Sequence, residues 1–230
     1  METWKQVLPD YEWMKWDFNR FDKASSTWVT EAFDNKKYAF AADYIRLYAL
    51  YNYGGFYLDM DVLARKSLNP FICLNTCLGW QNDGGLEVAA FGVEKHSAWI
   101  KDCLDYYSNR RFVNSDGTFN IKVLPRVIED LLREKGYEFV DVKNVAQAQD
   151  YEGKKIPVFP YYYFSPKSWK TGVIEENSET VLIHNFAGSW KTKSDIFFEK
   201  LKKIYIIKEY VIILICHPLF FFSKLKKRLL

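Results

Sequence analysis

The stretch from Thr30 to Val62 constrains the fold more than any other, because a helical pattern runs into a strand pattern there without a linker. Apolar and aromatic residues recur at helical spacing as far as Tyr53, which predicts a helix that begins near Thr30 or Asp34. A Gly-Gly pair follows at once and predicts the end of that helix. The next residues, FYLDMDV, form a short apolar run with two aspartates, which predicts a buried strand that ends in a polar site.

The remainder of the chain alternates between helical and strand patterns. Helices are predicted over Ala98–Tyr107 and Leu124–Glu134, and strands over Glu87–Val93, Tyr137–Val142, Ile156–Phe159 and Thr180–Ile183. Such alternation is typical of an α/β sandwich around a mostly parallel sheet. With 230 residues, of which 49% are hydrophobic, the chain fits one globular domain and an appendage. We place the domain at residues 1–200 and the appendage at residues 201–230.

Asp59 and Asp61 form a D-x-D pair at the end of the predicted strand. Residues two apart in a strand point to the same side, so both carboxylates are expected to face one site. Hard divalent cations such as Mg²⁺ or Mn²⁺ prefer oxygen ligands, and they often take one or two carboxylates together with substrate phosphates. A D-x-D on its own is a weak motif, and two solvated aspartates in a turn are the alternative.

The helix before the D-x-D carries Asp43 and Arg46, which are three residues apart and therefore on one helical face. An exposed ion pair of this kind contributes only about 0.3 kcal/mol and implies no function. In an apolar, aromatic segment the same two charges are costly unless they have partners. The pair is thus either a surface ion pair or part of a polar site that includes the D-x-D.

The segment AADYIRLYALYNYGGFYLDMDV resembles the signature of the DXD-containing glycosyltransferase sugar-binding family. The shared order is two small residues, Asp-Tyr-x-Arg, Leu-Tyr, and then Tyr-x-Gly-Gly-x-Tyr-x-Asp-x-Asp. The stretches LPDYEWMKW, SLNPF and HNFAGSW also fit, so the resemblance covers roughly Trp4 to Trp190. The family includes yeast-type initiating mannosyltransferases and bacterial capsule and surface-polysaccharide transferases. The wider superfamily includes the glucosylating domains of clostridial toxins.

The resemblance implies a fold of GT-A type, which is a Rossmann-like α/β sandwich, and a transfer that retains the anomeric configuration. It implies a nucleotide-diphosphate sugar as donor and Mn²⁺ or Mg²⁺ as cofactor. It also implies a glycan or lipid-linked glycan acceptor in the synthesis of surface polysaccharide. In this interpretation residues 1–200 are the catalytic domain.

The family's site residues carry over onto seven positions of this chain, namely Asp43, Arg46, Asp59, Asp61, His184, Ser189 and Trp190. The first four are implied to be catalytic. The two helix residues would hold hydroxyls of the donor sugar, the first D-x-D aspartate would contact ribose and sugar, and the second would bind the metal. His184 is implied to be a second metal ligand, and Ser189 and Trp190 to contact the diphosphate of the donor. The residue types suit these roles, since guanidinium groups offer a rigid fork of donors and neutral imidazoles commonly bind transition metals.

One element of the family's pattern is missing from this sequence. Family members begin with a strand like Ile-Pro-Lys-Ile-Ile-His that helps to form the nucleotide pocket, whereas this chain begins at about the following helix. An inactive transferase remnant that acts as a binding protein is therefore one alternative. A haloacid-dehalogenase-like phosphatase is another, because its nucleophile strand also ends in Asp-x-Asp. That chemistry needs a later acidic pair such as Gly-Asp-x-x-x-Asp, which the sequence after Asp61 lacks.

Several polar and sulfur-containing residues have plain structural interpretations. His96 and His217 lie outside any ligand pattern, and Gln81, Asn82 and Asp83 form either a polar turn or part of an acceptor site. Cysteines at positions 73, 77, 103 and 216 show no CxxC or zinc spacing, so we expect buried thiols rather than a Cys73–Cys77 bridge. Reduced thiols and the lack of an N-terminal signal peptide indicate the cytoplasm.

The end of the chain combines an apolar run with a basic cluster. From Lys200 onwards there are eight basic residues and one acidic residue, so the rest carries −4, the difference between a total of +3 and a tail of +7. A mildly acidic body is unlike a nucleic-acid-binding domain. Ile204–Phe222 is apolar, but charges and a proline interrupt it, and its charge-free part is shorter than the ~20 residues of a span. We expect peripheral attachment to the anionic inner face of the membrane, with a docked helix or a true span as alternatives.

Overall fold

The computed structural model describes residues 2–188, so Ser189, Trp190, Cys216, His217 and the predicted appendage lie outside the described residues. The helices are α1 (Glu2–Val7), α2 (Thr27–Asp34), α3 (Tyr38–Tyr53), α4 (Ala98–Ser108), α5 (Leu124–Glu134), α6 (Val145–Ala148) and α7 (Tyr161–Phe164), with 3-10 turns η1 (Lys23–Ser25) and η2 (Asn69–Phe71). The strands are β1 (Gly55–Leu58), β2 (Val62–Ala64), β3 (Thr76–Trp80), β4 (Leu86–Val93), β5 (Glu138–Asp141), β6 (Lys155–Phe159) and β7 (Leu182–His184). One compact unit covers Met1–Ala187, and the boundary at residue 200 stays a prediction.

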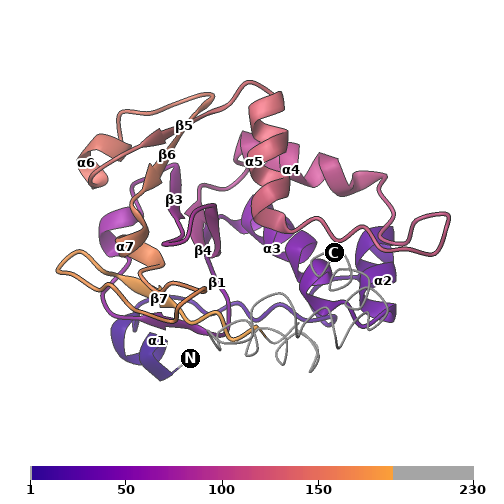
Figure 1. The fold of residues 1–230 in the computed structure, drawn as a ribbon, viewed down its shortest axis with the longest axis horizontal. Helices are drawn as coiled ribbons and strands as arrows, with labels where there is room; N and C mark the ends of the chain where they lie inside the picture. The colour runs from indigo at the N-terminus through magenta and orange to yellow at the C-terminus, as the bar shows by residue number, and fades with distance from the viewer. Residues whose placement is uncertain (1, 189–230) are drawn as a thin grey trace, which may run out of the picture. The chain divides into compact units, whose positions relative to one another are not determined.

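Five strands form one sheet in the order β1-β4-β3-β6-β5, and β2 and β7 form a separate antiparallel pair (Figure 1). The fold class is α/β, as predicted, but the expectation of a mostly parallel sheet is wrong. Only β3–β6 and β5–β6 are parallel, whereas β1–β4 and β3–β4 are antiparallel. The reason is the turn at residues 81–85, which joins β3 to β4 as a hairpin and therefore reverses the chain.

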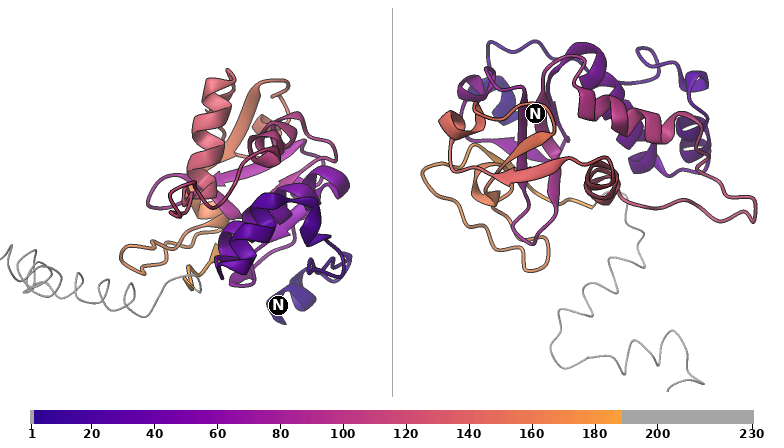
Figure 2. Two further views of the ribbon diagram at one scale, coloured as in Figure 1. Left: turned by 90° about the vertical axis from the view of Figure 1, so that its right-hand side faces the viewer. Right: turned by 90° about the horizontal axis from the view of Figure 1, so that it is seen from above.

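Two apolar clusters cover the two faces of this sheet and complete the sandwich. Helices α2 to α5 pack on one face, where Trp28, Leu47 and Ile100 meet side chains of β4 such as Phe91. On the other face α1, η2, α7 and the β2–β7 pair gather around Phe159. Figures 1 and 2 show α3, α4 and α5 on one side of the sheet and α1 and α7 on the other. The side chains between these layers form the core, and the polar site lies at one end of β1.

The predicted helix from Thr30 to Tyr53 is in fact two helices, α2 and α3. The chain leaves the helical conformation at Lys36, which has a left-handed φ of 59°. Its N–H donates to the carbonyl of Phe33, and the N–H of Lys37 donates to that of Ala32, both at 2.8 Å. These bonds satisfy carbonyls at the end of α2, as in common helix C-caps. The polar Asn-Lys-Lys stretch thus overrides the apolar periodicity on either side.

The D-x-D occupies a turn rather than a strand. Strand β1 ends at Leu58, the N–H of Val62 donates to the carbonyl of Asp59 at 3.0 Å, and β2 begins directly afterwards. The predicted position at the end of a strand is confirmed, but the predicted cause of the shared direction is wrong. A tight turn, and not the pleat of a strand, brings the two carboxylates to one side.

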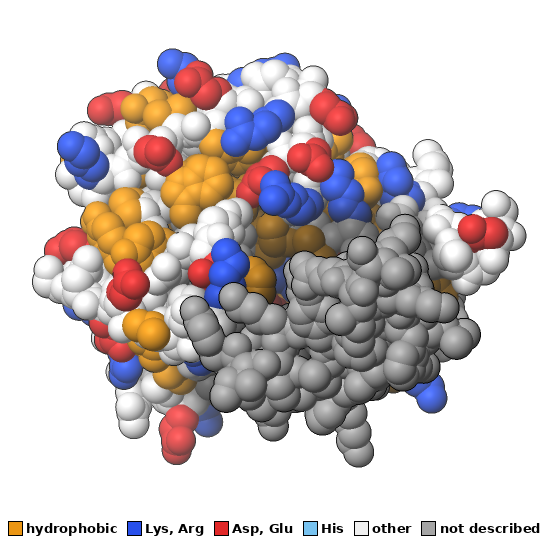
Figure 3. All heavy atoms as spheres, viewed as in Figure 1, with side chains coloured by type: hydrophobic (Ala, Val, Ile, Leu, Met, Phe, Trp, Pro, Cys, Tyr) orange, Lys and Arg blue, Asp and Glu red, His pale blue; other side chains and the backbone are white. Residues whose placement is uncertain are grey.

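The described cysteines are free thiols. Cys77 and Cys103 are buried, as expected, whereas Cys73 is exposed. On the face drawn in Figure 3, acidic and basic side chains of the described residues are interspersed. Among residues 2–188, no helix combines the length and the apolar composition that a membrane crossing requires.

The glycine before β1, Gly54, and the first residue of the strand, Gly55, are expected to differ in their contribution to stability. Both have positive φ, 69° at Gly54 and 88° at Gly55, but a Cβ at Gly54 would lie 2.7 Å from the backbone nitrogen of Lys95, whereas one at Gly55 would meet nothing within 4 Å. Gly55→Ala should cost about 1–2 kcal/mol of unfolding free energy through φ alone. Gly54→Ala should cost roughly 1–3 kcal/mol more, because backbone must move as well. Urea unfolding of the two variants measures the difference, and equal losses would show that the close approach to Lys95 does not matter.

Candidate functional site

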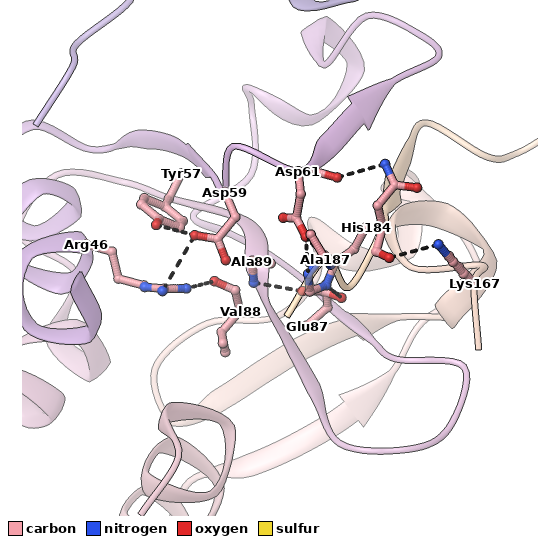
Figure 4. A network of polar contacts seen from close by, with 11 residues as sticks. Arg46, Tyr57, Asp59, Asp61, Glu87, Val88, Ala89, Lys167, His184 and Ala187 are labelled. Atoms are coloured by element: carbon pink, nitrogen blue, oxygen red, sulfur yellow. Dashed lines mark hydrogen bonds and ion pairs between the residues drawn. The ribbon is translucent and has the colours of Figure 1, made fainter. Parts of the chain in front are cut away.

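The centre of the site is the guanidinium of Arg46, which α3 directs under the end of β1. Arg46 is only 6% exposed. Its Nη1 donates to the carbonyl of Val88 at 2.7 Å, and its Nη2 lies 3.3 Å from Asp43 Oδ1 and 3.6 Å from Asp59 Oδ1 (Figure 4). The cation also lies over the ring of Tyr57, 4.5 Å from its centroid. The predicted helix pair is therefore a buried part of the D-x-D site and not a surface ion pair.

An irregularity in β4 supplies the carbonyl that Arg46 uses. Cys77 is paired with Gly92 and Gly79 with Glu87, so one residue of β3 faces four residues of β4. Such a bulge releases backbone groups from the ladder, and bulges are common beside active sites. Here the carbonyl of Val88 accepts from Arg46, and the carbonyl of Ala89 accepts from the N–H of Asp59 at 2.7 Å. The bulge thus attaches both the arginine and the D-x-D turn to the central sheet.

Asp59 is held in place by two neighbours. The hydroxyl of Tyr57 donates to its Oδ1 at 2.5 Å, and the guanidinium of Arg46 approaches the same oxygen. Burial and the charge of Asp59 raise the pKa of the Tyr57 phenol, although Arg46 opposes this shift, so Tyr57 stays a donor. The other oxygen, Oδ2, accepts no hydrogen bond from residues 2–188, and the side chain is 31% exposed. One carboxylate oxygen therefore remains available to a ligand.

The β2–β7 pair brings a distant histidine to the D-x-D. Val62 pairs with His184, which places the imidazole Nε2 3.7 Å from Asp61 Oδ2. The chain after His184 also contacts Asp61, because the N–H of Ala187 donates to Oδ2 at 2.7 Å and the side chain of Asn185 donates to the backbone carbonyl at 2.9 Å. On its other side, Nδ1 of His184 lies 3.0 Å from Oε2 of Glu87. The HNFA stretch thus folds over the second D-x-D aspartate.

The site holds more negative than positive groups. Four carboxylates, those of Asp43, Asp59, Asp61 and Glu87, surround the single guanidinium of Arg46 and the imidazole of His184. Burial and the charge of Asp59 raise the pKa of Asp43 to about 6 against the pull of Arg46. Burial alone would lower the pKa of His184, but Glu87, Asp61 and Asp59 raise it. An added cation would relieve this excess of negative charge.

The residues fit a divalent cation. One ligand atom each from Asp59, Asp61 and His184 lies within 4.8 Å of the other two. Asp59 and Asp61 would hold the ion through carboxylate oxygens and His184 through a ring nitrogen. Oxygen ligands suit Mg²⁺ and Mn²⁺ alike, whereas the imidazole favours a transition metal. The donor set therefore matches Mn²⁺ better than Mg²⁺.

The structure brings five of the seven predicted site residues together: Asp43, Arg46, Asp59, Asp61 and His184. His96 lies elsewhere, with its N–H donated to Tyr51 and its ring against that side chain. The stretch at residues 81–83 is a polar turn, in which Asp83 accepts from Ser168 and from the N–H of Lys170.

Sequence reasoning missed Glu87 and Tyr57. A charged residue inside the apolar run LEVAAFGV was the available signal for Glu87, because a buried charge requires a partner. The signal for Tyr57 was its position two residues before Asp59, at the end of the predicted strand.

Comparison with known proteins agrees with this geometry. Residues 1–78 match the family described as "Glycosyltransferase sugar-binding region containing DXD motif". That range contains both D-x-D aspartates and the Asp43–Arg46 pair. This part of the chain is therefore similar to the DXD glycosyltransferase family. The match ends at residue 78, so Glu87 and His184 are assigned to the site by geometry and not by the family match.

Two fungal relatives extend the comparison. The chain is 29% identical over 126 residues to "Mannosyl phosphorylinositol ceramide synthase SUR1" of Saccharomyces cerevisiae, across 49% of this chain and 33% of that protein. It is 35% identical over 68 residues to "Inositol phosphoceramide mannosyltransferase 3" of Schizosaccharomyces pombe, across 28% of this chain and 19% of that protein. Among solved structures, "PaToxG Glycosyltransferase" aligns with 46% of this chain and 39% of its own, at 24% identity and a TM-score of 0.36. The chain spans a third or less of the length of the two fungal relatives.

The raised pKa of Asp43 predicts an unusual pH dependence of stability. The pKa of Asp43 is about 6 in the folded protein, whereas the ordinary value, which applies to the unfolded chain, is 3.8. Between these pH values the folded protein therefore binds more protons than the unfolded chain. This carboxyl therefore lowers stability as the pH rises from 4 to 7, by roughly 3 kcal/mol at ~1.4 kcal/mol per pKa unit. Asp43→Asn removes the effect. The free energy of unfolding of the variant should therefore equal that of the wild type near pH 4 and exceed it increasingly as the pH rises to 7. Denaturant unfolding from about pH 4 to 8 measures the gain.

The control for this measurement is Asp150→Asn, at an exposed position. It should keep the wild-type dependence on pH. Parallel stability curves for the wild type and Asp43→Asn would show that Asp43 ionises normally and that its burial has no energetic consequence.

Proposed function

We propose that this protein transfers a sugar from a nucleotide-diphosphate sugar in a reaction that depends on Mn²⁺ or Mg²⁺. The observation that carries the proposal is the convergence of the D-x-D turn, His184 and the buried Asp43–Arg46 pair on one site. The groups on α3 and on the β1–β2 turn lie close together in the sequence, whereas His184 on β7 is more than a hundred residues away. Four residues of this site, Asp43, Arg46, Asp59 and Asp61, lie in the part of the chain that matches the DXD glycosyltransferase family.

Asp43 and Arg46 would bind the donor sugar. The guanidinium keeps one donor, Nε, without a hydrogen-bond partner among residues 2–188. A buried donor without a partner is costly, so a hydroxyl oxygen of the sugar would satisfy it. The carboxylate of Asp43 would accept from a neighbouring hydroxyl, and Asp59 would contact the sugar and ribose through Oδ2. Vicinal hydroxyls match such a row of fixed donors and acceptors.

Asp61 and His184 would hold the cation, with Asp59 beside them. When bound between these residues, a divalent cation would supply positive charge to stabilise the departing diphosphate. The backbone N–H of Ala187 donates to Asp61 at 2.7 Å. Ser189 and Trp190 follow directly in the sequence, which supports their proposed role in contacting the diphosphate.

The finer features of the reaction rest on the resemblance and on the names of the relatives. Retention of configuration and a role in surface-polysaccharide synthesis follow from the family resemblance alone. The two fungal relatives are named for mannosyl transfer and for inositol phosphoceramide. These names support a mannose donor as the first to be tested and a lipid-borne acceptor over a free glycan. A transferase remnant would keep the fold but show no metal-dependent hydrolysis of any nucleotide sugar.

A lipid-borne acceptor agrees with the proposed attachment to the membrane. The segment Ile204–Phe222 and the basic residues after it, at 224 and 226–228, would bind the anionic inner face of a membrane. The site residues from Asp43 to His184 precede this segment in the sequence, which supports a separation of attachment from chemistry. The protein would then act in the cytoplasm at the membrane surface.

The metal assignment predicts the effect of Asp61→Asn. An asparagine oxygen can still accept from Ala187, so the fold should persist while a charged metal ligand is lost. We expect Mn²⁺-dependent hydrolysis or transfer to fall at least ~100-fold, since the cation contributes several kcal/mol to the stabilisation of the leaving group. Steady-state turnover of nucleotide sugars, mannose donors first, is the measurement. Asp150→Asn at an exposed position is the control, and near-wild-type turnover of Asp61→Asn would refute the metal site.

The tail assignment predicts a separable loss of membrane binding. Replacement of Lys224, Lys226, Lys227 and Arg228 by Gln should weaken sedimentation with anionic vesicles, and raised salt should weaken the wild type in the same way. Hydrolysis of soluble nucleotide sugar should be unchanged, because none of these residues belongs to the site. Salt-independent sedimentation of both proteins would show that charge does not attach the tail.

A further inference from the structure

Glu87 is the one fully buried acidic residue of the site, and the proposed roles do not use it. It lies in β4, every residue of which is buried, and its own exposure is 0%. A carboxylate in such surroundings is strongly destabilising unless hydrogen bonds or an opposite charge compensate it. Among the described residues, no Lys or Arg pairs with it. Its environment therefore has to be explained by its hydrogen bonds.

The two oxygens of Glu87 have different partners. Oε1 accepts from the backbone N–H of Ala89 at 2.7 Å, a group that the bulge of β4 releases from the sheet ladder. Oε2 lies 3.0 Å from Nδ1 of His184. The first bond fixes the carboxylate on β4, and the second connects it to β7. The side chain of Glu87 is thus a rigid link between the central sheet and the imidazole (Figure 4).

This link determines which nitrogen of His184 carries the proton. An ionised carboxylate can only accept, so Nδ1 must be the protonated nitrogen in a neutral imidazole. Nε2 then carries the lone pair, and it is Nε2 that faces Asp61 at 3.7 Å. An acceptor behind a histidine is the usual means of orienting the ring and of selecting its tautomer for metal binding.

We propose that Glu87 is a positioning residue, which holds His184 in the Nδ1–H tautomer with Nε2 directed at the D-x-D. The expected consequence, tighter binding of Mn²⁺, rests on the proposed function. The tautomer of His184 does not, because it is a property of the protein without metal. The two parts can therefore be tested separately.

Glu87→Gln is the informative variant, because it keeps the shape and removes one acceptor. If the amide oxygen stays on Ala89, the amide NH₂ faces His184 and requires an unprotonated Nδ1. The proton then moves to Nε2, which can no longer bind a metal. If the amide turns over, its oxygen still accepts from Nδ1–H, but its NH₂ opposes the N–H of Ala89, so this orientation is disfavoured. The favoured orientation keeps the bond to Ala89, and in it the tautomer of His184 changes.

The first measurement is nitrogen NMR of the full chain labelled with ¹⁵N-histidine, without metal and at alkaline pH where imidazole is neutral. The chain has three histidines, and His184→Gln identifies the signal of interest. We expect the Nδ1–H pattern in the wild type and its loss in Glu87→Gln. An Nε2–H pattern for His184 in the wild type would overturn the proposal, whether or not the variant folds.

The second measurement is Mn²⁺ affinity by electron paramagnetic resonance. We expect Glu87→Gln to bind Mn²⁺ about 10–100-fold more weakly, as is usual when the partner of a metal-bound histidine is removed. Glu129→Gln is the matched control, since Glu129 is also buried and accepts from a β4 backbone N–H, that of Leu86, but does not contact His184. It should bind Mn²⁺ as the wild type does.

The outcomes separate the positioning role of Glu87 from the proposed function of the protein. Wild-type Mn²⁺ affinity in Glu87→Gln, with affinity lost in Asp61→Asn, would show that Glu87 serves only the fold. An equal loss in Glu129→Gln would overturn the positioning role as well. If the wild type binds no Mn²⁺ and hydrolyses no nucleotide sugar, the proposed function fails, and the NMR pattern then decides the role of Glu87 alone.

Discussion

The rest of the site depends on the contacts that the buried guanidinium of Arg46 makes. It joins α3 to the bulge of β4 through Val88 and to the D-x-D turn through Asp59. Removing the guanidinium would leave Asp43 and Asp59 without their opposite charge, and breaking a buried ion pair in this way typically costs about 3–5 kcal/mol. The packing of α3 against the sheet therefore determines where the first D-x-D carboxylate lies.

A second constraint is the excess of carboxylates around this guanidinium. Asp43 and Asp59 share Arg46, while Asp61 and Glu87 face His184 from opposite sides. Burial is the main cause of the raised pKa of Asp43, with Asp59 adding to it, whereas Glu87, Asp61 and Asp59 raise the pKa of His184 against the effect of its burial. A cation beside the D-x-D would reduce that repulsion. Metal binding and donor binding are thus expected to support one another.

The sequence predicted the local parts of this site but not their assembly. Asp43, Arg46 and the D-x-D lie within one continuous segment, so helical spacing and strand ends were sufficient to associate them. The contact between Asp61 and His184 depends on the β2–β7 pair, which joins residues more than a hundred positions apart. Neither that pairing nor the bulge at Glu87–Gly92 has a local periodicity. The mixed direction of the sheet escaped prediction because β3 was not recognised beside its hairpin turn.

The central claim is that β7 brings His184 to the D-x-D as a ligand of the same cation. Electron spin echo modulation of protein-bound Mn²⁺ tests this most directly, because it detects nitrogen nuclei bonded to the ion. The account predicts the signal of one imidazole nitrogen, which changes to the ¹⁵N pattern after histidine labelling and disappears in His184→Gln. Bound Mn²⁺ that depends on Asp61 but shows no nitrogen signal would contradict the account.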